Sequence, residues 1–195
     1  MNVVFDYLVN GRNTLRGMKM LVEKLKDVDL GHEPFVDFIS YWLALPKTNG
    51  LPYQSDFNPA DVRHLLQDIT IYEMLENNTI RCRLMGTGLV EGFGWDYTDH
   101  DYLSLWAEDD RDKLLYHFKK MLEMQMGIST DLIAIAQSGF EVSGSAIWLP
   151  ASDGNGKATR IIALTNEDTP KNSRDPREDK VVQVKASRIS FIDFN

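Results

Sequence analysis

The chain has 195 residues, of which 43% are apolar and 26% charged, a composition typical of a globular domain. Its formal net charge of −8 argues against nucleic acid and anionic membranes as partners, because both require a basic face. Cys82 is the only cysteine, which excludes an internal disulfide and a cysteine-rich metal site. We recognise no cleavable signal and no apolar run of membrane-spanning length, so a cytoplasmic protein is expected.

Two amphipathic helices are predicted within residues 1–46. The first is indicated by apolar residues at helical spacing, namely Leu15, Met18, Val22 and Leu25. The second begins at Pro34 and is closed by Pro46. Both stripes are typical of faces that pack on a core, and the first could also pair with its copy in a second chain. We therefore expect residues 1–46 to cap the domain or to hold a dimer together.

From residue 69 onward the pattern changes to that of β-strands. Residues 69–75 and 79–85 are β-rich, and Glu76-Asn77-Asn78 between them is a hairpin signal. In the second segment Ile80, Cys82 and Leu84 alternate with two arginines. Alternate residues of a strand point to opposite faces, so these three are expected on one apolar inner face.

Residues 109–126 give the strongest helical pattern, and Gly127 is the expected stop. Three further β segments follow over residues 130–137, 140–149 and 159–165, with turn-forming residues between them. Residues 168–180 hold two prolines and eight charged residues and are predicted to be a mobile excursion. A closing strand over 181–194 would extend the sheet edge or pair across a dimer.

This order predicts an α+β fold. We expect a five-stranded antiparallel sheet with helices on one face, plus the N-terminal helices and an extra C-terminal strand. The chain then divides into the N-terminal helices (1–46), a core (47–167), and a polar loop with the closing strand (168–195).

A family resemblance is carried between about residues 35 and 105 by Trp42 and by several strings: Leu51-Pro52, Asp56-Phe57-Asn58-Pro59 before a short helix ending Leu65-Leu66, Arg81-Cys82-Arg83-Leu84-Met85-Gly86-Thr87 and Gly94-Trp95-Asp96-Tyr97-Thr98. With the element order, they resemble PAS sensor domains, and more narrowly a group of free-standing bacterial PAS-like proteins best represented in alphaproteobacteria. Asp99 stands where such proteins usually have glycine, which adopts a positive φ at lower cost. The resemblance implies a PAS-like fold and a sensory role, often through dimers, and carries over no catalytic residue.

A ligand cavity between the sheet and the long helix is one interpretation of the aromatic residues. The alternative is that these side chains only fill the core. The candidate pocket residues are Cys82, Leu84, Trp95, Tyr97, Leu114, Phe118, Met121 and Trp148.

Two residues invite comparison with cofactor-binding PAS proteins. His117 lies on the long helix, where haem-binding relatives carry an axial histidine, but its place at the margin of the apolar stripe favours a half-solvated boundary residue. Cys82 lies on a strand, whereas light-sensing relatives use a cysteine in a helical motif, so a small buried hydrophobe is expected. Haem and flavin are therefore not supported, and no cofactor is expected.

Two other motifs have structural explanations. The glycine-rich string from Gly86 to Gly94 departs from the dinucleotide-binding spacing and fits a tight strand-to-helix turn. Consecutive acids at Asp99-His100-Asp101 and Glu108-Asp109-Asp110 could suggest a metal site, but the second group fits a helix N-terminus better. No metal site is predicted.

We expect a non-enzymatic sensory or regulatory module that binds a small ligand, a signalling partner protein, or both, as a homodimer. One alternative is a small enzyme on a cone-shaped α+β sheet. It would need an acid or histidine in the cavity, and the predicted inner faces contain neither. The other is a purely structural dimer, whose pocket would be too small for any ligand.

Overall fold

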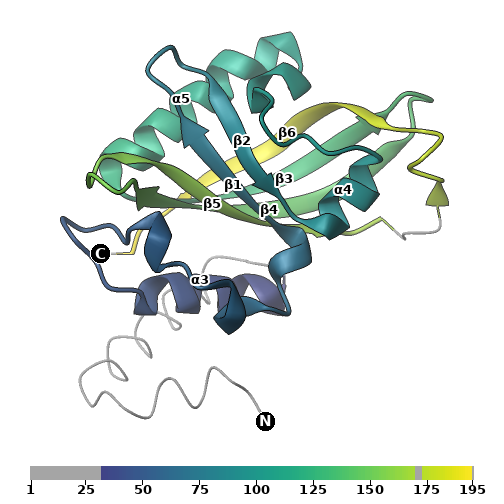
Figure 1. Ribbon diagram of the computed structural model, residues 1–195. Coiled ribbons are helices and arrows are strands. Elements are labelled where there is room, and N and C mark those ends of the chain that lie inside the picture. The colour runs from purple at the N-terminus through teal and green to yellow at the C-terminus, as the bar shows by residue number, and fades with distance from the viewer. Residues whose placement is uncertain (1–31, 170–172, 195) are drawn as a thin grey trace.

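Residues 32–169 and 173–194 are described by the computed structural model (Figure 1). Their elements in chain order are α3 (Glu33–Ala44), η1 (Gln54–Asp56), η2 (Pro59–Val62), η3 (Leu66–Asp68), β1 (Ile69–Met74), β2 (Ile80–Met85), α4 (Thr87–Phe93), η4 (Tyr102–Leu105), α5 (Glu108–Met124), β3 (Gly127–Ala136), β4 (Glu141–Ser152), β5 (Ala158–Glu167) and β6 (Val181–Ile192). The first predicted N-terminal helix, which carries the stripe from Leu15 to Leu25, lies outside the described residues, so its role in dimerisation stays a prediction.

The strands form one six-stranded antiparallel sheet in the order β2-β1-β5-β4-β3-β6. Its first five strands are those predicted from the alternating segments. β6 pairs with β3 of the same chain, from Gly127 opposite Ile192 to Ala136 opposite Val181. The closing strand therefore extends the sheet within the chain, which the sequence had left open.

The sheet carries helices on both faces (Figure 1). On the inner face, defined by Trp148 and Ile161, the sheet packs with η4 and α5 in one apolar cluster. On the outer face, defined by Ile147 and Ile162, it packs with α3. The expected helical layer is confirmed for α5, and α3 adds a second layer on the opposite side.

The helix α3 is fixed to the sheet by a buried tryptophan. The indole Nε1 of Trp42 donates a hydrogen bond of 2.9 Å to the carbonyl oxygen of Pro150. Proline cannot donate to a neighbouring strand, but its carbonyl remains an acceptor. The predicted second N-terminal helix is confirmed, and its Trp42 is 2% exposed.

The hairpin of β1 and β2 contains a bulge that the sequence pattern does not reveal. Ile71 pairs with Leu84 but Tyr72 pairs with Cys82, so Arg83 is an extra residue in β2. Because a bulge shifts the alternation by one residue, Leu84 turns to the outer face, where it is 46% exposed. The expectation that Leu84 faces the interior is wrong. Cys82 points inward as expected.

Four of the described residues other than glycine take the left-handed backbone conformation at turns, and Gln125 and Asp99 are two of them. Gln125 has φ 56° and ends α5, so the helix stops before Gly127, which is the first residue of β3. Asp99 has φ 66°, so the positive φ is kept despite the missing glycine. The amide of Asp99 donates to the carbonyl of Cys82 at 2.7 Å, which covers part of the free edge of β2.

The described part of the connection between β5 and β6 is anchored to the domain, in contrast to the expected mobile excursion. The carboxylate of Asp179 accepts hydrogen bonds from the amide and hydroxyl of Ser138 at 2.8 and 2.6 Å. The guanidinium of Arg174 donates to the carbonyl oxygens of Gly92 and Asp179. These contacts hold residues 173–180 against α4 and the turn between β3 and β4.

Candidate ligand cavity

A cavity of about 60 Å³ lies on the inner face beneath α4 rather than beneath α5. The strands β1 to β6 all contribute to its walls, and α4 and η4 cover it. Its apolar wall residues are Met85, Leu89, Phe93, Leu105, Leu132, Ala134, Val142, Val181 and Val184. The cavity is therefore largely apolar, as in most small-molecule sites.

The position of α4 over the cavity depends on glycines at the turn from β2. A Cβ atom on Gly86 would lie 2.4 Å from the carbonyl oxygen of Gln67, and one on Gly88 would lie 2.8 Å from the carboxylate of Asp68. The neighbour of Gly86 is backbone, which cannot move aside, so only glycine fits at that position. The glycine-rich string is thus a tight strand-to-helix turn, as expected.

Hydroxyl and thiol groups supply polar lining in the cavity: Tyr72, Cys82, Tyr97 and Tyr102. Burial raises the pKa of Cys82 to about 12 and holds the pKa values of all three tyrosines above their ordinary value. At neutral pH these four groups are consequently uncharged. They can exchange hydrogen bonds with a ligand, but none is ionised to act as a base or nucleophile.

The cavity adjoins an outer cleft of about 470 Å³. Four residues belong to the walls of both: Gly92, Val142, Glu167 and Arg174. The hydrogen bond from Arg174 to the carbonyl oxygen of Gly92 therefore spans the boundary between the interior and the cleft.

The predicted pocket residues divide between four locations. Cys82 and Tyr97 line the cavity. Trp95 lines outer clefts, and its indole Nε1 donates to the carbonyl of Val181 at 3.0 Å. Leu84 is on the outer face, as described above. The remaining four are buried to 1% exposure or less and pack in the core: Leu114, Phe118, Met121 and Trp148.

The region beneath α5 is thus solid, and Phe118 and Trp148 fill the core there, whereas Tyr97 lines the cavity. The rings of Phe118 and Trp148 meet edge to face with centroids 4.8 Å apart. None of the four residues from this region is among the residues that line the cavity.

His117 is not placed to ligate a group in the cavity. Its Nδ1 lies 2.6 Å from the carbonyl oxygen of Lys113, and its ring stacks on Phe191 with centroids 5.6 Å apart. The cavity is also far smaller than the roughly 300–1,000 Å³ of pockets that hold drug-sized ligands, so neither a haem nor a flavin fits as it stands. His117 is a boundary residue, the alternative that its place in the stripe favoured.

The acidic strings have structural roles. The carboxylate of Asp101 accepts from the amides of Ile80 and Leu103, both at 3.1 Å. Glu108, Asp109 and Asp110 occupy the first turn of α5, where negative charge is favourable. Within residues 32–169 and 173–194, no group of three or more histidine, cysteine or acidic side chains is arranged to hold a metal ion.

Several cavity residues were not predicted from the sequence, although for some of them a signal existed. Thr70 and Tyr72 line the cavity and alternate with the outer-face residues Ile69 and Ile71, so the strand period could have found them. Met85 takes the inward place expected of Leu84. For Arg174 there was no signal, because it reaches the cavity from a long connection whose course depends on tertiary contacts.

The antiparallel sheet, the short helices after β2 and the long helix before β3 define a PAS-type fold. A family model described as a PAS domain matches residues 30–165, and the chain belongs to this family. PAS domains are sensory modules that often bind ligands. No curated protein matches the sequence.

Solved PAS and light-oxygen-voltage (LOV) domains resemble the chain in fold. A LOV domain studied with a flavin analogue is 12% identical, with a TM-score of 0.45, over 56% of this chain and 83% of that chain. A variant of the Drosophila melanogaster Cycle PAS-B domain with bound glycerol is 10% identical, with a TM-score of 0.42, over 51% and 97%. The Rhodobacter sphaeroides LOV protein is 11% identical, with a TM-score of 0.44, over 60% and 69%. Among the helices described here, none has both the length and the apolar character to cross a bilayer.

Proposed function

We propose that this PAS domain is a non-enzymatic sensory module that binds a small, uncharged molecule in the cavity beneath α4. The observation that carries the proposal is the cavity itself, which combines an apolar wall with hydroxyl and thiol groups kept neutral by burial. A charged ligand beside those groups would lose its hydration without gaining an opposite charge, because the charged wall residues Glu167 and Arg174 lie at the boundary with the cleft.

The volume limits both the size and the affinity of the ligand. One buried water needs about 10–15 Å³ of such space, so a cavity of about 60 Å³ holds a few waters or one molecule of few non-hydrogen atoms. The best very small ligands gain about 1.5 kcal/mol per atom. A ligand of about five atoms would thus bind no tighter than roughly micromolar. A sensor of this kind responds to an abundant small molecule.

The rival function of a small cavity enzyme would have to use Glu167, the only carboxylate among the cavity-lining residues in the described part of the chain. A general base in such an enzyme is normally buried so that its pKa approaches neutrality. Glu167 is exposed at the boundary with the cleft. Its surroundings therefore favour a rim residue over a catalytic base.

Nuclear magnetic resonance under xenon pressure tests ligand binding without knowledge of the natural ligand. Xenon enters apolar cavities, so it should shift the methyl signals of Leu89, Leu132 and Val142, which line the cavity. The methyl groups of Leu114 and Leu122 beneath α5 are the internal control. Equal shifts in both groups, or none, would contradict a cavity confined to the region under α4. Native mass spectrometry with an absorption spectrum then reports any co-purified molecule.

We further propose that the domain is a cytoplasmic homodimer and passes its signal by contact with a signalling protein. Support comes from the PAS family, whose members commonly dimerise and interact with partners, and from the apolar stripe at residues 15–25. Analytical ultracentrifugation of the full chain and of a variant with Leu15→Ser and Val22→Ser tests the dimer. A monomeric wild-type chain, or a dimer that these two changes leave intact, would remove the basis for this assignment.

A further inference from the structure

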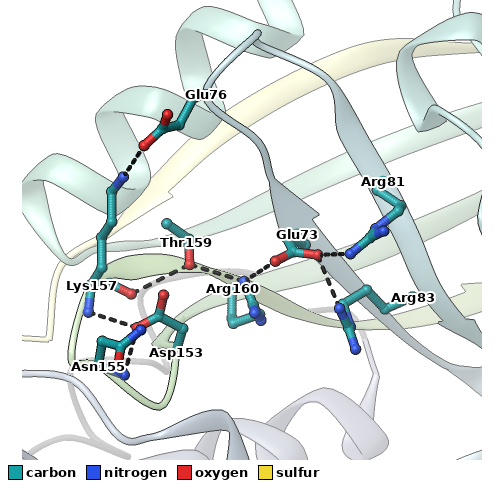
Figure 2. A network of polar contacts seen from close by, with 9 residues as sticks. All are labelled: Glu73, Glu76, Arg81, Arg83, Asp153, Asn155, Lys157, Thr159 and Arg160. Atoms are coloured by element: carbon teal, nitrogen blue, oxygen red, sulfur yellow. Dashed lines mark hydrogen bonds and ion pairs between the residues drawn. The ribbon is translucent and has the colours of Figure 1, made fainter.

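The outer face of β1, β2 and β5 carries a cluster in which three arginines surround one glutamate (Figure 2). The Oε1 atom of Glu73 lies 2.7 Å from Nη1 of Arg160. Its Oε2 atom is shared by two guanidiniums, those of Arg81 and Arg83, the latter at 3.0 Å. Although burial of the carboxyl raises its pKa, the hydrogen bonds from Arg81 and Arg83 and the charge of Arg160 hold the pKa of Glu73 below its ordinary value. Glu73 is therefore ionised.

The cluster has more donors than its acceptors can satisfy. Each guanidinium has five N–H groups, yet Arg81 and Arg83 share a single carboxylate oxygen, and Nε of Arg81 is buried without a partner. Their side chains are 37% and 43% exposed, whereas that of Arg160 is only 14% exposed. Arg160 thus serves as the buried anchor, while the guanidiniums of Arg81 and Arg83 remain partly open to solvent.

The nearby carboxylates do not compensate Arg81 and Arg83. Asp153 lies close enough to feel the charge of Arg160, but its carboxylate accepts from the amides of Asn155 and Lys157 at 2.9 and 3.0 Å (Figure 2). Glu76 pairs with the ammonium of Lys157 at 3.1 Å. Both acids lie toward the turn between β4 and β5 in Figure 2, away from the two exposed arginines on β2.

An exposed apolar residue adjoins these arginines. The bulge in β2 turns Leu84 to the outer face immediately after Arg83, and Leu84 is 46% exposed. The combination of two arginines with unused donors and one exposed leucine is complementary to an acidic segment that also carries apolar side chains. In a chain of net charge −8, such a basic site is a local exception.

We propose that Arg81, Arg83 and Leu84 form a docking surface for an acidic peptide segment of a partner protein. Carboxylates of the segment bind the two guanidiniums, and an apolar side chain packs on Leu84. This inference rests on the proposal that the domain acts by contact with another protein, but it is independent of the cavity.

Fluorescence anisotropy with a labelled peptide of alternating glutamate and leucine tests the surface. The wild-type chain should bind it, and binding should weaken as salt rises from low to physiological concentration. Arg83→Ala should weaken binding about fivefold, and the double change Arg81→Ala with Arg83→Ala should weaken it more. Leu84→Ser should weaken it at both salt concentrations, because its contribution is apolar.

The matched control is Arg188→Ala. Arg188 also lies on an edge strand, is 54% exposed and pairs with one carboxylate, that of Asp131, at 3.0 Å. It should change binding less than about twofold. Equal losses from Arg83→Ala and Arg188→Ala would show that general charge attraction suffices and would overturn the proposal, as would absence of binding by the wild-type chain.

Two further measurements separate other occupants from a peptide. Complete competition by inorganic phosphate, together with unchanged binding in Leu84→Ser, would identify a free-anion site and overturn the proposal. If the wild-type chain is a dimer and Arg83→Ala is a monomer, the surface binds a second copy of the chain, and the peptide proposal is overturned. Thermal unfolding checks each variant, and Arg83→Gln, which keeps a polar side chain, replaces Arg83→Ala if the latter unfolds. The xenon experiment reports on the cavity alone, and the anisotropy experiment reports on the docking surface alone. Failure of the cavity proposal and failure of the docking proposal can therefore be told apart.

Discussion

The inner face of the sheet is covered by two helices, and the space beneath them differs. Beneath α5, large side chains such as Phe118 and Trp148 meet in direct contact and leave the region solid. Beneath α4, the facing sheet residues include small ones such as Ala134 and Val142, and a cavity of about 60 Å³ remains. The two regions share one sheet and one apolar cluster. Aromatic residues occur in both regions, because Tyr72, Tyr97 and Tyr102 line the cavity. The comparison therefore teaches that aromatic content alone does not distinguish a solid region from a hollow one, and that small sheet residues and the glycine-rich turn accompany the cavity.

The largest expected effect on stability comes from removing a large side chain from the solid region beneath α5. Phe118 is fully buried against Trp148, so Phe118→Ala should lower the free energy of unfolding by about 3–5 kcal/mol. Urea denaturation measures the loss. The comparison region is α4, where Phe93→Ala removes a partly buried ring beside an existing cavity and should cost less. A larger loss from Phe93→Ala would reverse our assignment of the two regions.

A larger side chain should be tolerated in the hollow half and not in the solid half. Ala163 is fully buried and lies opposite Trp148 in the neighbouring strand, so Ala163→Leu should destabilise the domain by about 1–3 kcal/mol through overpacking. Ala134 lines the cavity, and Ala134→Leu should cost less than about 1 kcal/mol while abolishing the xenon shifts. Similar costs at both positions would mean that the cavity cannot accept added volume.

Release of Arg174 should open the hollow half. Its guanidinium donates to the carbonyls of Gly92 and Asp179, so Arg174→Ala should lower stability by about 1–2 kcal/mol. Amide hydrogen exchange in residues 89–93 should become faster than in α5. Arg177→Ala, in the same connection and exposed, should change stability by less than about 0.5 kcal/mol. Unchanged exchange in Arg174→Ala would show that this contact does not restrict access.

The smallest effect on stability at neutral pH is expected from the thiol and hydroxyl groups that line the cavity. At that pH they are protonated in both the folded and the unfolded chain. Burial raises the pKa of Cys82 to about 12, and it raises those of Tyr72 and Tyr102 as well. Above roughly pH 8.5 the unfolded thiol loses a proton that the folded thiol keeps, so stability should fall as pH rises toward about 12. Urea midpoints at about pH 7 and about pH 10 measure the fall. In Cys82→Ala, stability should fall less with rising pH than in the wild-type chain. An equal fall in both chains would show that Cys82 does not contribute.

The sheet was largely predictable because its signals are local. Alternation and turn residues located the strands, and Gly139 and Gly156 take the positive φ expected at hairpin turns, 88° and 81°. The extra residue at Arg83 was not predictable, since a bulge leaves the period of a short segment unresolved until its partner strand is known. That one residue moved Leu84 out of the candidate cavity and onto the surface proposed for docking.

The candidate site was less predictable than the fold. Cys82 and Tyr97 were found because they belong to strings with a recognisable pattern, and both line the cavity. Four of the other candidates were chosen for size and apolar character, and these properties describe core residues as well as cavity walls. A cavity is the space that remains where packed side chains do not fill the interior. Its position depends on the packing of α4 and of the connection at Arg174, which the sequence pattern does not specify.

The pairing of β6 with β3 has a consequence for solubility. An uncovered long strand offers its amides and carbonyls to any other chain and invites fibrous aggregation. β6 covers β3 from Gly127 to Ala136, and it carries register shifts near Leu132 and Ala136 that interrupt a flat edge. The exposed cations Lys185 and Arg188 lie on β6 itself, and charged side chains on an edge strand discourage its pairing with a strand of another chain. Removal of residues 181–194 should therefore leave a protein that precipitates.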